Sequence, residues 1–296
     1  MWGLLLLLAA CEARISGSPG DPVLADAPLS PDDDAAIDAA TDATVMLGPW
    51  STPAKVPQAS TTAGEDDVTL SSNGLEMIFS IDGGTNGKDL YYMSRASTAA
   101  GWATATKLPF NIATFSDETP RFSADDKTLF FASDRVTKGN LDIYSVTHPT
   151  PDALSWGTAQ VLTTASTTAS EKWYMPCGNR YMMVQSTATS GTDLVEGPLG
   201  GTATPVPVLN SAQSETGTFL TPDCLTIYFA SARTPPQMIY KATRPTVTAP
   251  WSNPTAVVDF AMVGGNQEDP WLSPDGRTFA FASDAAGTKD VYLSTR

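Results

Sequence analysis

A strand-like hydrophobic pattern recurs about every 50 residues along this chain. In its clearest copy, residues 268–284 (EDPWLSPDGRTFAFASD), a short strand runs into a Pro-Asp-Gly turn, and large and small side chains then alternate. Similar segments cover residues 66–82, 118–134, 171–186 and 215–231. Alternation with a period of two around turn-forming residues predicts antiparallel hairpins.

The spacing of these hairpins predicts the architecture. The residue before each turn is, in order, Ser71, Ser123, Pro176, Thr221 and Ser273, which gives spacings of 52, 53, 45 and 52 residues. A third strand, such as the one that begins Asp-Val-Tyr at Asp290, follows each hairpin. A strand-rich repeat of this length is typical of propeller blades.

Tryptophan marks a fourth strand, which lies 20 to 22 residues before the next turn; the markers are Trp50, Trp102, Trp156 and Trp251. The third unit lacks its tryptophan and uses residues 204–209 instead, which accounts for its short period. Since one fourth strand precedes the first blade and the chain ends after a third strand, the N-terminal strand is expected to pair with the last blade. We therefore predict an all-β, five-bladed propeller of four-stranded antiparallel blades over residues 49–296.

The Ser-Pro-Asp-Gly turn, the aromatic strand and the following Ser-Asp resemble the TolB-like propeller repeat, a relative of WD repeats. The resemblance covers residues 49–296 and is closest in the units at Ser123 and Ser273. It implies the propeller fold. TolB itself has a larger ring and an extra domain, so the resemblance does not carry the Tol function with it.

The N-terminus reads as an export signal. Residues 1–11 are apolar and end in Leu-Ala-Ala-Cys, too short a run to span a bilayer. The sequence resembles a bacterial lipoprotein signal, which implies that Cys11 is acylated and becomes the new N-terminus. Glu12 is not the aspartate that retains such proteins at the inner membrane, so the outer membrane is favoured. The alternative is a plain signal peptide with an incidental cysteine.

Charge is concentrated in the segment that follows. Residues 12–48 hold eight acidic residues and one arginine, a net −7 of the chain's −15. Such an acidic segment, poor in large apolar residues, is expected to be a disordered linker. The acidity argues against nucleic acid as a partner, and contact with the membrane is expected through the lipid alone. We expect a monomer.

Acidic residues recur where each innermost strand begins, namely at Asp66, Glu118, Glu171, Glu215 and Glu268. If these side chains meet in the central channel, they are candidates for binding a cation such as calcium or a polyhydroxylated ligand. The competing interpretation is that each carboxylate caps backbone N–H groups within the ring. Neither an EF-hand nor a calcium-binding nonapeptide spacing occurs, and no cofactor is expected.

Cys177 and Cys224 replace turn residues in the third and fourth units. Paired departures from the repeat in an exported protein suggest a disulfide between neighbouring blades. Two separate thiols remain the alternative.

The sequence offers little catalytic machinery. His148 is the only histidine, and neither a Gly-x-Ser-x-Gly elbow nor a nucleotide-binding motif is present. The first hypothesis is a non-enzymatic binding scaffold at the cell envelope with a protein or glycan partner. The alternative is a carbohydrate-binding or glycoside-hydrolysing propeller that uses the channel carboxylates. A functional face is expected at the unit of Pro176, which departs most from the repeat.

Overall fold

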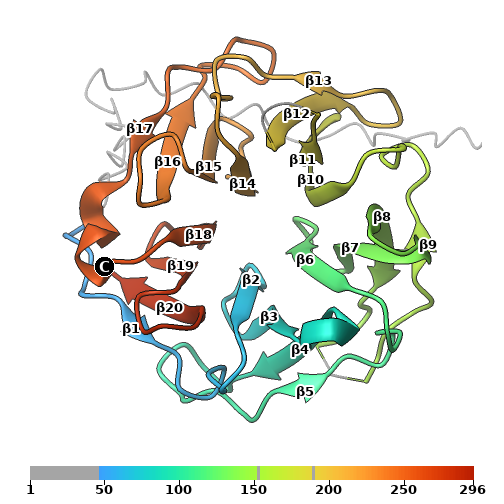
Figure 1. The fold of residues 1–296 in the computed structure, drawn as a ribbon. Coiled ribbons are helices and arrows are strands. Elements are labelled where there is room, and N and C mark those ends of the chain that lie inside the picture. Colours follow the sequence, from blue (N-terminus) through green and yellow to red (C-terminus); the bar gives the residue numbers. More distant parts are fainter. Residues whose placement is uncertain (1–46, 152–153, 189–190) are drawn as a thin grey trace, which may run out of the picture. The chain divides into compact units, whose positions relative to one another are not determined.

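Alternating side chains and tight turns arrange the chain into sheets around a central axis in the computed structural model (Figure 1). The structure describes residues 47–151, 154–188 and 191–296. Cys11 and nearly all of the expected linker lie outside these residues. Within the described part of the chain, no helix is long and apolar enough to cross a membrane.

Each sheet is a blade of four antiparallel strands. Blade 1 consists of β2 (Glu65–Leu70), β3 (Glu76–Asp82), β4 (Lys88–Ser94) and β5 (Thr106–Lys107). Blade 2 consists of β6 (Asp117–Phe122), β7 (Thr128–Thr137), β8 (Asn140–Thr147) and β9 (Gln160–Val161). Blade 3 consists of β10 (Glu171–Cys177), β11 (Arg180–Ser186), β12 (Thr192–Pro198) and β13 (Thr204–Pro205).

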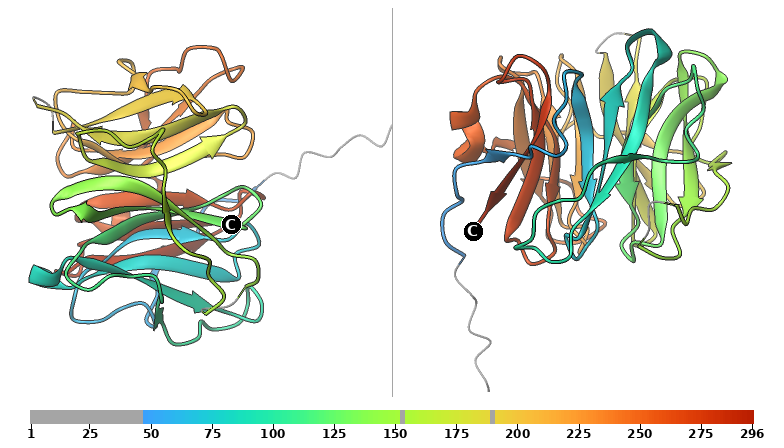
Figure 2. Two further views of the ribbon diagram at one scale, coloured as in Figure 1. Left: turned by 90° about the vertical axis from the view of Figure 1, so that its right-hand side faces the viewer. Right: turned by 90° about the horizontal axis from the view of Figure 1, so that it is seen from below.

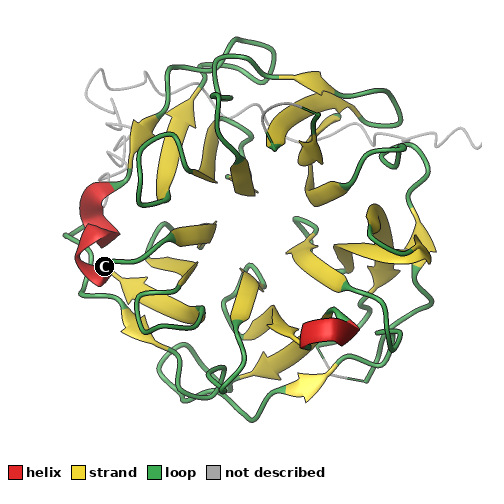
Figure 3. Cartoon of the chain, in the orientation of Figure 1, coloured by secondary structure: helices red, strands yellow, loops and turns green. Residues whose placement is uncertain are grey.

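Blade 4 consists of β14 (Glu215–Leu220), β15 (Thr226–Ser231), β16 (Met238–Thr243) and β17 (Thr255–Ala256). Blade 5 consists of β18 (Gln267–Leu272), β19 (Thr278–Ser283), β20 (Asp290–Thr295) and β1 (Ala54–Lys55). Two short 3-10 helices, η1 (Gly84–Asn86) and η2 (Val258–Val263), interrupt the loops (Figure 3). The prediction of a five-bladed, four-stranded propeller is confirmed.

Ring closure follows the predicted route. Strand β1 pairs with β20, with Ala54 opposite Leu293. On either side of β1, the Ser51 N–H donates to the Thr295 carbonyl at 2.7 Å and the Val56 N–H to the Val291 carbonyl at 2.8 Å. The edge of blade 5 is therefore covered by the start of the domain, which satisfies backbone groups that would otherwise be exposed.

The strands run between two loop-covered faces (Figure 2). We call the face where the innermost strands β2, β6, β10, β14 and β18 begin the charged face. The opposite face, where each of these strands turns into the next, is the turn face. On the turn face, Cys177 and Cys224 form a disulfide that joins the turns of blades 3 and 4, with the two Cα atoms 5.8 Å apart.

A repeated stacking contact fixes the tryptophan of the fourth strand. In blade 5 the Arg296 guanidinium stacks on the Trp50 ring at 4.1 Å, and its Nε donates to the Gly276 carbonyl in the turn at 2.7 Å. Arg95 and Arg244 make the same contacts in blades 1 and 4. In blade 2 the ring of His148 takes the place of the arginine and stacks on Trp156. His148 is thus a packing residue between blades.

Candidate functional site

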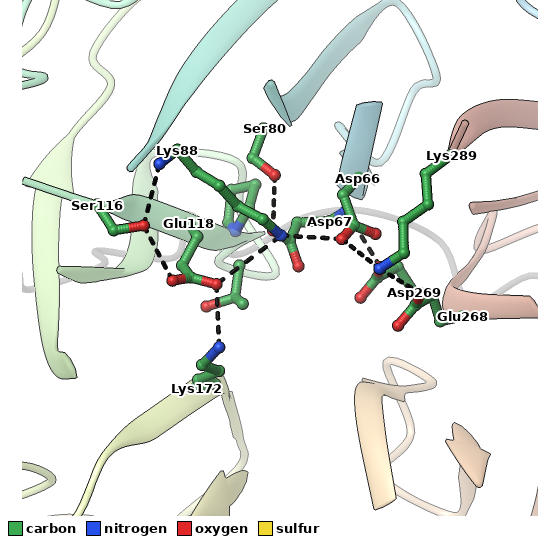
Figure 4. Close-up of polar contacts among 12 residues, drawn as sticks. Asp66, Asp67, Ser80, Lys88, Ser116, Glu118, Lys172, Glu268, Asp269 and Lys289 are labelled. Carbon is green, nitrogen blue, oxygen red and sulfur yellow. Dashed lines mark hydrogen bonds and ion pairs between the residues drawn. The ribbon is translucent and has the colours of Figure 1, made fainter. Parts of the chain in front are cut away.

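A β-bulge near the start of each innermost strand positions the residues of the central channel. The register shifts after the second residue of each strand. The third residue has a positive φ of 49° to 58° and is Asp67, Thr119, Trp173, Gly217 or Asp269. A bulge re-aims side chains, and acids of blades 1, 2 and 5 point toward one another here (Figure 4).

Lys88 of β4 connects the acids of blades 1 and 2. Its Nζ lies 2.8 Å from Asp66 Oδ2, 2.9 Å from Asp67 Oδ2 and 3.9 Å from Glu118 Oε2. The Asp67 carboxylate also accepts a hydrogen bond from the Ser80 hydroxyl at 2.6 Å. One ammonium group therefore neutralises carboxylates from two blades.

Two further lysines extend the network around the axis. Lys289 ion-pairs with Asp66 at 2.7 Å and also with Glu268 (Figure 4). Lys172, the second residue of β10, pairs with Glu118 at 3.0 Å. Because Gln237 of blade 4 also donates to Glu268 at 3.3 Å, all five blades take part.

Asp66 and Asp269 have pKa values that are shifted in opposite directions. Asp269 is fully buried; its Oδ1 accepts from the Trp173 indole at 2.6 Å, and its Oδ2 accepts from the Asp67 N–H at 3.1 Å. Burial, together with the charges of Asp66 and Asp67, raises the pKa of Asp269 well above its usual range. Burial also acts to raise the pKa of Asp66, but Lys88, the hydrogen bond with Asp269 and Lys289 outweigh it and hold that pKa far below its usual value. We therefore expect the proton on Asp269 and the negative charge on Asp66.

Arg121 crosses the channel beneath the acids. Its fully buried guanidinium donates to the carbonyls of Val68 in blade 1 and Thr218 in blade 4, at 3.0 and 2.9 Å. Burial lowers its pKa, while the charges of Asp269, Asp67 and Asp66 raise it. On the turn face the same residue lines an apolar hollow of about 130 Å³.

Cationic side chains lie against the acids of the channel. Oxygen atoms of Asp66, Asp67 and Asp269 lie within 4.8 Å of one another, close enough to hold a cation. However, lysine ammonium groups already lie against Asp66 and Asp67. Five acids face three lysines and Arg121, so cationic side chains offset most of their negative charge. This arrangement favours ion pairs between blades over metal ligation.

The structure brings together only three of the five acids expected in the channel, namely Asp66, Glu118 and Glu268. Glu171 and Glu215 stand one position earlier, as the first residues of β10 and β14. The sequence-based list of acids therefore mixed two neighbouring strand positions, whose side chains point to opposite sides of the strand.

Acids at the first position of an innermost strand accept hydrogen bonds from the loop that precedes the strand. The Glu171 carboxylate accepts from the Thr167 N–H at 3.0 Å, and that of Glu215 accepts from the Ser211 N–H at 3.1 Å and the Ser211 hydroxyl at 2.6 Å. Burial raises the pKa of Glu171, against the hydrogen bonds from Thr167 and Gln185 that lower it. These two residues thus have the capping geometry that the competing interpretation expected.

Sequence reasoning missed Asp67, the three lysines and Arg121. Two signals were available. Acids are doubled at the start of blades 1 and 5, and a Lys-Asp pair opens the third strand in both blades, at Lys88 and Lys289.

Replacing Asp269 with asparagine tests the buried proton. Because the folded-state pKa of Asp269 is raised, its contribution to the free energy of unfolding is complete below about pH 4 and is lost as the pH rises toward the folded-state pKa. Asp269→Asn removes this loss, so its stability relative to the unmodified protein should grow with pH, by up to about 1.4 kcal/mol per pH unit. Urea denaturation between pH 4 and 8 measures the difference.

Asp223→Asn is the control for this experiment. The hydrogen bond from the Thr221 hydroxyl lowers the pKa of Asp223, so its contribution changes only below about pH 4. If Asp269→Asn and the unmodified protein keep parallel profiles above pH 4, Asp269 does not hold the proton.

Comparisons with solved structures show which known proteins share the propeller fold. Neither a protein-family model nor a curated protein matches the sequence. The structure is similar to a protein assigned as TolB from Agrobacterium tumefaciens, with a TM-score of 0.52 and 18% identity over 81% of this chain and 82% of that one.

Glycoside hydrolases have the same fold. The GH62 α-L-arabinofuranosidase PaAbf62A from Podospora anserina gives a TM-score of 0.56 at 13% identity, over 84% of this chain and 96% of that one. An endo-arabinase from Bacteroides thetaiotaomicron gives 0.51 at 10% identity, over 83% and 97%. At these identities the likeness concerns the fold alone. This chain is a five-bladed β-propeller structurally similar to TolB-like and GH62 propellers.

Proposed function

We propose that this protein is a non-enzymatic binding scaffold at the bacterial cell envelope. The observation that carries the proposal is the pairing of the channel carboxylates. Asp66, Asp67, Glu118 and Glu268 each bind a lysine, and Asp269 binds the Trp173 indole. Acids neutralised in this way hold blades together and are not free for general acid–base catalysis.

The distances between the acids support the same conclusion. Glycoside hydrolysis by the usual two-carboxylate mechanism needs groups roughly 5–10 Å apart with a sugar or water between them. Asp66, Asp67 and Asp269 have oxygens within 4.8 Å of one another and are buried. They are arranged to bind one another rather than to flank a glycosidic bond.

Export and lipid anchoring form the second part of the proposal. The apolar segment ending at Cys11 supports a lipoprotein signal, and the acidic residues 12–48 support a tether between lipid and propeller. The Cys177–Cys224 disulfide is compatible with an oxidising compartment. The expected location is the outer membrane.

Mass spectrometry of the protein expressed in a bacterial host with its full N-terminus tests the anchor. The mature chain should begin at an acylated Cys11 and fractionate with membranes, and Cys11→Ser should be released unmodified into the soluble fraction. Membrane association of the Cys11→Ser variant, or an N-terminus other than Cys11, would contradict the lipid anchor.

A panel of arabinan, xylan and nitrophenyl glycosides tests the competing hydrolase hypothesis. We expect no product from the intact protein and no difference in the Glu118→Gln and Glu268→Gln variants. Product that forms with the intact protein and disappears in either variant would establish the hydrolase instead.

A further inference from the structure

In four blades, a tryptophan of the chain fills the outer groove against the preceding blade. The Trp50 ring lies 5.6 Å from Phe260 and 5.8 Å from Phe279, and the Trp156 ring lies 5.3 Å from Phe110. Each of these tryptophans stands four residues before the first residue of its fourth strand. The groove is thus a defined binding slot for an indole.

Blade 3 has the slot without its tryptophan. Counting back four residues from β13 places Gly200 at the tryptophan position, and only five residues connect β12 with β13. The arginine or histidine that stacks on the indole is also replaced. In blade 4 this residue is Arg244, whose N–H donates to the Leu225 carbonyl. The equivalent N–H in blade 3, which donates to the Asn179 carbonyl, belongs to Leu199. The Leu199 side chain is left 47% exposed.

A cavity of about 360 Å³ lies at this place, between blade 3 and the loop that joins it to blade 2. Tyr181, Met183 and Gln185 of β11 line one side of it. By strand register, Tyr181 and Met183 correspond to Phe279 and Phe281 of blade 5, which pack against Phe260.

The remaining lining is small and uncharged: residues 163–167 from the loop after β9 and residues 200–203. Thr164 has the same position before blade 3 that Phe110 has before blade 2. Each lies two residues after a leucine whose backbone N–H donates to the third strand of the preceding blade. Both large groups that fill the neighbouring slot, Phe110 and Trp156, are therefore missing here.

We propose that this cavity binds an aromatic side chain, preferentially an indole, of a partner polypeptide. The inference rests on the proposed binding function and names its site. Four sister slots show that the groove fits an indole, and its neutral lining disfavours charged ligands. An inserted ring would pack on Met183 and Tyr181, in place of the missing tryptophan.

N-acetyl-tryptophanamide is the probe for the experiment. Methionine methyl groups carry ¹³C, and Met183 is assigned with the Met183→Leu variant. The probe should shift the Met183 signal saturably, with a dissociation constant of about 1–10 mM for a ligand of this size. Thr164→Phe supplies the ring that Phe110 provides in the preceding slot and should weaken this binding at least about tenfold, whereas Thr164→Ser should leave it unchanged.

Three results would overturn the proposal: no shift of Met183 at saturating probe, an equal shift with N-acetyl-leucinamide, or a preference for arabinose or xylobiose. None of them bears on lipid attachment at Cys11 or on hydrolysis, so failure here is distinguishable from failure of the proposed function.

Discussion

Replacing Trp50 with alanine is expected to lower the free energy of unfolding by about 3 kcal/mol, because it removes a ring packed against two phenylalanines. Trp50 contacts Phe260 and Phe279 edge-on and stacks under Arg296, the last residue of the chain. It therefore fastens β1 to a blade that is otherwise built from the opposite end of the sequence. Urea denaturation measures the loss.

Trp102→Ala is the matched control, because Trp102 has the same place in blade 1 and stacks with Arg95. In blade 1 the fourth strand, β5, follows β4 in the sequence. Detachment of β5 therefore leaves the ring closed, because β5 does not join the two ends of the domain. Amide hydrogen exchange should rise more in β20 of Trp50→Ala than in β4 of Trp102→Ala. Equal exchange in the two variants would show that β1 does not act as the closure of the ring.

Removing the Cys177–Cys224 disulfide is expected to cost about 3–4 kcal/mol of unfolding free energy. The bond closes a loop with a sequence separation of 47 residues and so restricts the unfolded chain. It also joins turns of two neighbouring blades. Denaturation of Cys177→Ala/Cys224→Ala, compared with the oxidised protein, measures the effect.

A reducing agent provides the control. It should destabilise the unmodified protein to the level of the double variant and leave the double variant unchanged. An unmodified protein whose stability does not respond to complete reduction, verified by thiol titration, would show that the bond does not constrain the unfolded chain.

Much of the fold could be predicted from the sequence because its signals are local. Turn residues such as those after Ser273, and the alternation that follows, define each hairpin within about 17 residues. The position of Trp50 before the first blade then predicted that the N-terminal strand pairs with the last blade, and the structure confirms this pairing. The missing tryptophan of the third unit was visible too, but not the cavity that it leaves beside Tyr181.

The sequence by itself thus determined the number of blades, their four strands and the route of closure, since each follows from the period of the pattern. Only the tertiary structure decided which acids meet at the axis. Asp66 is the second residue of its strand and turns inward, whereas Glu171 is the first residue of its strand and caps a loop. Ring closure sets the Asp67 N–H against the Asp269 carboxylate 202 residues away. The local sequence pattern does not reveal which acids turn inward or which strands meet, because both depend on how separate strands are packed around a common axis.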